Sequence, residues 1–168
     1  MIDSRTAAGA LGLVTLAAAR AAAESKSLDE VIKVVHNMIP KVHMIGVMDT
    51  LFYLAKGGRI PKIAAWAGTV LKIKPIFSLS QGRPAPVTAV RTRSRGMERL
   101  LEIIGQRIGA NGPLHVIVMH ANVLEEAEGL KQRITSEFNC AEIYVKDFTP
   151  VMGVHTGPGL LGVAFYAD

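Results

Sequence analysis

The stretch Gly153–Gly159, with the sequence Gly-Val-His-Thr-Gly-Pro-Gly, directly precedes an apolar run at residues 160–166. Three glycines and a proline in seven residues predict a tight turn, and they argue against the interior of a helix or strand. The run that follows predicts a buried strand. We therefore expect His155 and Thr156 to lie on a turn at the mouth of a sheet, with backbone N–H groups free to face an anion. The alternative is a tight turn whose histidine is only solvated.

The composition fits one ordinary domain, or one domain and part of another. The chain has 168 residues, of which 49% are hydrophobic, and this is enough for a substantial core or an apolar cavity. The single cysteine, Cys140, excludes an internal disulfide and is typical of a reducing cytoplasm. The net charge of +5 indicates an anionic partner.

The alanine-rich segment near the N-terminus resembles the core of a signal peptide. It lacks a clearly basic leader, because Asp3 offsets Arg5, and Arg20 ends the apolar run well short of a membrane span. Alanine is the best helix former, so we expect a helix at Ala7–Ala23 that packs closely against other elements. Because this helix is apolar nearly all round, we expect it to be buried on more than one side.

Local patterns predict an α/β chain with an inserted antiparallel hairpin. A capping box at Ser27–Glu30 opens a helix that stops before Pro40, and Asp49 or Thr50 caps a short helix ended by two glycines. Further helices are expected at residues 64–71, 94–108 and 122–138. Strands are expected at residues 44–48, 114–119 and 141–145, and the hairpin at residues 73–79 and 86–90.

Basic residues are concentrated in the middle of the chain. About half of them lie between Lys56 and Arg99, where Glu98 is the single acid. Such a cluster can bind phosphates or nucleic acid, or it can be a solvated face. Aromatic residues make up only 5% of the chain and none lies among residues 91–99, which argues against stacking on single strands. We therefore expect no nucleic-acid partner.

Other motifs leave alternatives open. The glycines of Lys56–Ile60 match neither a Walker loop nor a dinucleotide fingerprint, and Arg59 either pairs with a carboxylate or faces an anion. His120 follows a strand at the position where α/β proteins bind ligands, or it caps the next helix. The histidines show no ligand spacing with one another or with Cys140, so we expect no metal and no cofactor.

Four ordered segments resemble the DegV family. They are Phe52–Ile60, Leu71–Ile76, Val90–Arg93 and His155–Gly159, and the resemblance covers essentially the whole chain. It implies a fatty-acid-binding protein of bacteria, the non-enzymatic binding subunit of fatty acid kinase. In such proteins an acyl chain lies in a tunnel between two α/β domains, and a separate ATP-binding kinase subunit phosphorylates the carboxyl group.

The resemblance also implies roles for individual residues. His155 corresponds to the histidine that contacts the carboxylate, with Thr156 beside it, and Arg91 to the arginine near the head group. Arg59 resembles an arginine offered to the kinase, and Arg93 lies close enough in sequence to share the partner or phosphate contact. A His, a hydroxyl and an Arg supply the charge-assisted hydrogen bonds that a buried carboxylate needs.

One departure from the family concerns length, because its members run to nearly three hundred residues. The resemblance implies that residues 1–42 are the helical remainder of a truncated N-terminal α/β domain and that residues 43–168 form the C-terminal domain. We therefore expect exposed helices and self-association when this chain is studied alone. The competing function is a small-anion or phosphate-binding α/β module with a regulatory role. The sequence does not specify which acyl chain is preferred, or whether the chain binds a fatty acid without the N-terminal domain of the family.

Overall fold

A six-stranded sheet runs through the molecule in the order β3-β2-β1-β6-β4-β5. The computed structural model describes residues 1–58, 73–80, 82–108 and 112–168. The helix expected at residues 64–71, and Arg59, lie outside the described residues. In chain order the elements are α1 (Ala8–Ala23), α2 (Leu28–Met38), β1 (His43–Val47), α3 (Phe52–Lys56), β2 (Lys74–Ser80), β3 (Arg83–Val90), α5 (Arg93–Ile108), β4 (Leu114–His120), α6 (Leu124–Glu137), β5 (Cys140–Asp147), α7 (Pro150–Thr156) and β6 (Leu161–Ala167).

The sheet is mainly antiparallel, and only β4 and β5 pair in parallel. The hairpin predicted from the sequence is present as β2 and β3, with Ser80 paired to Arg83. Pro84 and Pro86 are tolerated because β3 is an edge strand, where a missing backbone donor breaks no inner ladder. The mixed α/β class expected from the sequence is confirmed.

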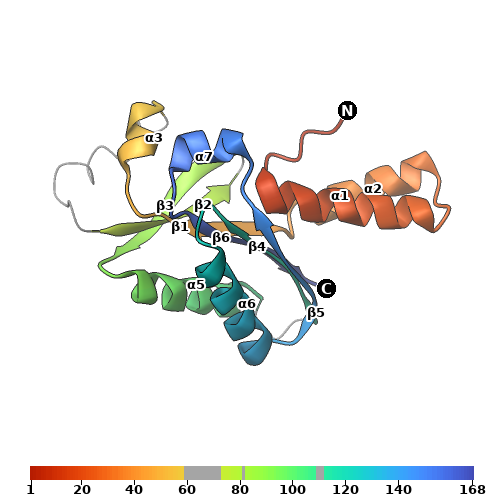
Figure 1. Ribbon diagram of the computed structural model, residues 1–168. Helices are drawn as coiled ribbons and strands as arrows, with labels where there is room; N and C mark the ends of the chain where they lie inside the picture. The colour runs from red at the N-terminus through yellow and green to blue at the C-terminus, as the bar shows by residue number, and fades with distance from the viewer. Residues whose placement is uncertain (59–72, 81, 109–111) are drawn as a thin grey trace.

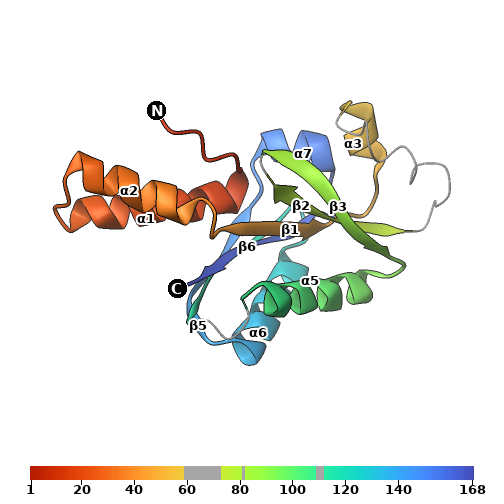
Figure 2. The same cartoon turned by 180° about the vertical axis from the view of Figure 1, so that it is seen from behind.

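One face of the sheet is covered by α5 and α6 (Figures 1 and 2). Leu100 and Ile104 of α5, together with Leu130 of α6, pack against Val163 and Phe165 of β6, and all five side chains are fully buried. Alternate residues of β6 turn to the two faces of the sheet, and both faces are covered. This explains why the terminal strand predicted from the sequence is a continuous apolar run without polar alternation.

The other face is covered by α1, α7 and α3, and α2 packs along α1 (Figure 1). Gly9 of α1 lies directly against Met119 of β4 and Ala164 of β6, so close that a Cβ at this position would overlap the Met119 sulfur. The expected helix at Ala7–Ala23 therefore has a core within this chain. It is not buried all round, because the Leu11 side chain is 43% exposed. The domain boundary at residue 42 stays a prediction.

Several helix boundaries follow the sequence signals. The Ser27 hydroxyl accepts from the Glu30 N–H while the Glu30 carboxylate accepts from the Ser27 N–H, so the predicted capping box opens α2. Thr50 rather than Asp49 supports the start of α3, because its Oγ1 accepts from the Phe52 N–H at 3.1 Å. The glycine at 57 follows α3, as expected.

The prediction of a turn throughout Gly153–Gly159 is wrong for its first half. Gly153 and His155 belong to α7, which starts with Pro150 at its first position, where a missing N–H removes no helical hydrogen bond. Within this stretch, only Gly157 and Gly159 have positive φ angles, +76° and +85°. Their N–H groups donate to the carbonyls of Gly153 and Ala121, so these two donors are not free to bind an anion.

Candidate functional site

An apolar cavity of about 190 Å³ lies on the face of the sheet covered by α7 and α3. Its walls come from β1, β2, β3, α3 and α7, and from single residues that precede α1, follow β1 and β5, and precede β6. The lining side chains are almost all aliphatic, aromatic or thioether groups: Ala7, Met44, Ile45, Met48, Leu54, Phe77, Leu79, Pro84, Phe148, Met152 and Leu160. Gly46, Ser78, His155 and Thr156 complete the lining. Such a wall suits a hydrocarbon chain rather than a small hydrated anion.

His155 brings the only imidazole to this lining. It lies on the last turn of α7, and its Nδ1 atom is buried without a hydrogen-bond partner among the described residues. A buried polar nitrogen without a partner is unfavourable by about 1–3 kcal/mol. An acceptor such as a carboxylate oxygen would remove that penalty if Nδ1 carries the proton.

Thr156 is next to it and buried, at 8% exposure. Its hydroxyl donates to the Met152 carbonyl one turn earlier in α7, at 2.8 Å. That hydrogen bond uses the single proton of the hydroxyl, so in this rotamer Thr156 offers a ligand only lone pairs. The structure therefore brings His155 and Thr156 to one cavity as the sequence predicts, but it gives them unequal capacity to hold an anion.

Arg93 lies outside the cavity, in a cluster of charges beyond the end of β1. Its guanidinium donates to the Glu126 carboxylate at 2.5 Å and lies 3.6 Å from Asp49 Oδ1, which also accepts from Lys74 Nζ at 2.9 Å. The Asp49 carboxylate in turn lies against Gly159, at a place that a Cβ would fill. This cluster therefore joins β1, β2, α5 and α6 to the loop before β6.

The Arg93 side chain is only 19% exposed, and its Nη2 atom is buried without a hydrogen-bond partner in the part of the chain that the structure describes. By contrast, Arg91 is exposed. Neither arginine lines the cavity, so a head-group contact of Arg91 stays a prediction. The role expected for Arg59 falls on a residue outside the described parts of the chain.

His120 ends β4 as predicted and is 5% exposed. Its Nδ1 lies 3.4 Å from Asp147 Oδ1 without the geometry of a hydrogen bond, and Asp147 is largely exposed. His120 is not among the cavity residues. Within the described ranges, no group of three histidine, cysteine or acidic side chains could hold a metal ion. No helix there is both long and apolar enough to cross a membrane.

The sequence analysis named His155 and Thr156, which line this cavity, but missed Ser78 and the apolar wall. Met48, Phe77, Phe148 and Met152 come from four separate segments, and each has the pattern of an ordinary core residue. The one available signal was the high hydrophobic content, which allowed for a cavity without indicating where it lies.

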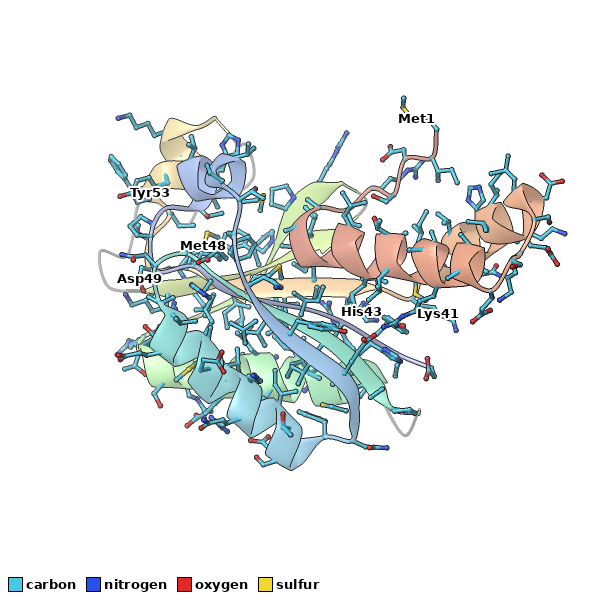
Figure 3. The ribbon with its side chains drawn as sticks, turned by 45° about the vertical axis from the view of Figure 1, so that its right-hand side comes forward. Met1, Lys41, His43, Met48, Asp49 and Tyr53 are labelled. Carbon is cyan, nitrogen blue, oxygen red and sulfur yellow. The ribbon has the colours of Figure 1, made fainter. Side chains whose placement is uncertain are left out.

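Figure 3 shows Met48, Asp49 and Tyr53 on the same side of the molecule, close to α7.

Comparisons of the sequence and of the fold with known proteins all identify the same family. A family model described as "Uncharacterised protein, DegV family" matches residues 1–168. A DegV domain-containing protein of Clostridium acetobutylicum is 34% identical over 168 residues, which cover all of this chain and 59% of that protein. The chain thus spans about three fifths of the length of the curated relatives it matches.

Solved structures of the same family share the fold. DegV of Bacillus subtilis, described as a fatty acid binding protein, is 29% identical with a TM-score of 0.85, and the match covers 99% of this chain and 60% of that one. A DegV family protein of Thermus thermophilus, whose structure is described as showing fatty acid binding, has a TM-score of 0.92 at 24% identity. That match covers 99% of this chain and 60% of the other, and it establishes likeness of fold alone.

Proposed function

The chain belongs to the DegV family, and from this premise we propose that it binds a long-chain fatty acid in the apolar cavity under α7. The acyl chain lies along Met48, Phe77 and Met152, and the carboxylate accepts a hydrogen bond from His155. The observation that carries the proposal is a nearly wholly apolar cavity with one imidazole nitrogen at its wall, His155 Nδ1, that has no hydrogen-bond partner in the described part of the chain. The fatty acid binding described for the Bacillus subtilis relative supports it.

The energetics of this cavity favour a lipid over a small anion. Each buried CH₂ group contributes about 0.8 kcal/mol, so the acyl chain rather than the head group supplies most of the binding free energy. Among the described residues, a free phosphate in the same place would find one imidazole, the Ser78 side chain and a Thr156 hydroxyl that already donates to Met152, while the N–H groups of Gly157 and Gly159 are already paired. The apolar wall therefore disfavours the alternative of a regulatory module for small anions at this site.

The proposal includes a partner that phosphorylates the bound acid. The chain then acts as a binding subunit and presents the carboxyl group to a separate kinase subunit that carries ATP. Arg59, Arg91 and Arg93 are the cations proposed to face that partner or its phosphates, because guanidinium groups hold phosphate oxygens in a bidentate manner. The exposed position of Arg91 suits contact with a partner better than contact with a buried acyl chain.

The test begins with the ligand. Native mass spectrometry of the purified protein, followed by lipid extraction, should recover a long-chain fatty acid in a stoichiometric amount. His155→Ala should then weaken fatty-acid binding by about 1.5–3 kcal/mol, the range for hydrogen bonds to charged groups. Val154→Ala is the matched control, because Val154 precedes His155 on α7 and is 72% exposed. Unchanged affinity in a folded His155→Ala variant would remove this residue from the site.

The partner is tested separately with the kinase subunit and ATP. Arg59→Ala and Arg91→Ala should reduce formation of acyl phosphate more than they reduce fatty-acid affinity, because these arginines are assigned to the partner or its phosphates. Fluorescence titration gives the affinity, and hydroxylamine trapping gives the acyl phosphate. Equal losses of binding and turnover in both variants would place the two arginines in the acyl site instead.

A further inference from the structure

A second, polar cavity of about 640 Å³ lies at the other end of β1, between the residues that precede α1 and the end of α2. Arg5, His36, His43 and Arg107 contribute to its lining, as do the hydroxyls of Ser4 and Thr6. Figure 3 shows His43 and Lys41 on the side of the molecule away from Met48 and Asp49. The cavity is therefore separate from the charge cluster around Asp49.

A smaller cavity of about 230 Å³ shares His43 and Arg107 with it and adds Lys41. The carboxylates that line the two spaces already have partners. Asp3 Oδ1 accepts from the Arg5 N–H at 2.9 Å, and Asp168 Oδ2 lies 3.3 Å from His115 Nε2. With the histidines neutral, the three cations Arg5, Lys41 and Arg107 face the side-chain carboxylates of Asp3 and Asp168, so the side chains that line the two cavities carry a formal surplus of one positive charge, which favours an anion.

Arg107 is the central cation of this region. It lies in the last turn of α5, is partly buried, and makes no hydrogen bond or ion pair with the residues that the structure describes. Burial lowers the pKa of its guanidinium. None of its side-chain nitrogens is among the buried atoms that lack a partner in the described residues, so water reaches them, and an anion with several oxygens would replace that water with charge-assisted hydrogen bonds.

His43 experiences the same lack of negative charge. Burial lowers the pKa of its imidazole, and the positive charge of Arg107 lowers it further. A dianion bound between the two would reverse the second effect, because a nearby negative charge favours the protonated imidazole. The His43 pKa is therefore a local reporter of occupancy.

We propose that this basic cavity binds the phosphate group of a small molecule, with Arg107 as the principal ligand and His43, Lys41 and the Ser4 and Thr6 hydroxyls as further donors. A guanidinium fork, an ammonium group and hydroxyls together match the several oxygens of a phosphate better than the two of a carboxylate. The volume lies in the range typical of small-molecule sites, about 300–1,000 Å³. The basic cavity shares Ser78 and Leu79 of β2 with the lining of the fatty-acid cavity, but none of the proposed phosphate donors lines the fatty-acid cavity, so failure of this proposal would leave the proposed function intact.

The first experiment titrates the full chain with inorganic phosphate by isothermal titration calorimetry. Arg107→Gln should weaken phosphate binding by about tenfold or more, the factor that one charge-assisted hydrogen bond contributes. Arg99→Gln is the matched control on the same helix, because Arg99 pairs with Glu102 at 2.7 Å and lines neither cavity. Equal affinities in the two variants, or no binding by the unmodified chain, would overturn the proposal.

Two further arms locate the site and the source of the phosphate. His155→Ala should bind phosphate unchanged, whereas loss of binding there would move the anion to the fatty-acid cavity and refute the proposal. NMR titration should show that saturating phosphate raises the His43 pKa, and an unchanged pKa would also refute it. If the ligand is a soluble phosphate, Arg107→Gln should not change the binding of the protein to vesicles that contain phosphatidic acid. Arg107-dependent binding to vesicles, without competition by inorganic phosphate, would overturn the small-molecule assignment.

Discussion

The ion-pair network around Glu142 joins α1 to the edge of the sheet, and it gives a prediction with a defined pH dependence. Both carboxylate oxygens of Glu142, on β5, accept from the Arg20 guanidinium of α1, at 2.7 and 2.6 Å. His115 and Tyr144 also contact this carboxylate, at 2.7 and 2.8 Å. The hydrogen bonds from Arg20, and then those from His115 and Tyr144, lower the pKa of Glu142 from 4.5 to about 2.

The size of the effect follows from the two pKa values. A change from 4.5 to about 2 corresponds to about 3 kcal/mol of stabilisation at neutral pH. Solvent screening reduces this figure because the Arg20 side chain is 45% exposed, although that of Glu142 is only 15% exposed. We therefore expect Glu142→Gln to lower the free energy of unfolding by about 1–2 kcal/mol at pH 7.

The pH dependence has a definite sign. The folded-state pKa lies below the unfolded value, so the unfolded chain takes up the proton first as the pH falls. The stabilisation is complete above about pH 4.5 and is lost as the pH falls toward 2. At pH 3 the difference between the unmodified chain and Glu142→Gln should be less than about half of its value at pH 7.

Urea unfolding followed by circular dichroism at pH 7 and pH 3 measures both quantities. Glu137→Gln is the matched control, because Glu137 also pairs with an arginine, Arg133, but on the exposed surface of α6 with both side chains more than 40% exposed. It should cost less than about 0.5 kcal/mol. Equal destabilisation by the two variants, or a Glu142→Gln difference that is as large at pH 3 as at pH 7, would refute the reasoning.

Two further predictions concern α7 and the exposed face of α1. Gly157→Ala should lower the free energy of unfolding by about 1–3 kcal/mol, because φ at this position is +76° and the new Cβ would overlap the Tyr53 ring. Gly153→Ala is the comparison: a Cβ there would have no neighbour within 4 Å, so this variant should be neutral or stabilised by up to about 1 kcal/mol. Thermal unfolding compares the two variants, and equal losses of stability would contradict the argument from the positive φ and the Tyr53 contact of Gly157. The 168-residue chain should self-associate through the apolar groove between α1 and α2, whose lining includes Leu11 and Leu28. The Leu28 side chain is 75% exposed, so Leu28→Lys should reduce the self-association that sedimentation velocity measures. A monodisperse unmodified monomer would contradict it.

The sequence predicts most of this fold because its local signals agree with one another. The capping box at Ser27 and the hairpin between β2 and β3 are encoded within a few residues each. The family resemblance is confirmed by a family model over the whole chain. The sequence analysis missed the helix at Pro150–Thr156 because it took Gly153 as evidence against a helix. The low helix propensity of one glycine is outweighed here by packing, since Met152, His155 and Thr156 of α7 line the cavity.

The chemistry of the site could be predicted only in part, because a motif specifies residue types and not where their protons go. Next to Gly157, His155 and Thr156 look equally suited to hold a carboxylate. In the structure the Thr156 proton is already given to Met152, while His155 Nδ1 has no partner in the described parts of the chain. A carboxylate only accepts hydrogen bonds. His155 can donate to it without breaking a hydrogen bond within the protein, whereas Thr156 must first break its hydrogen bond to Met152, which contributes about 1 kcal/mol. We therefore expect the proposed head-group interaction to fall first on His155, and binding of a carboxylate there requires the tautomer with the proton on Nδ1.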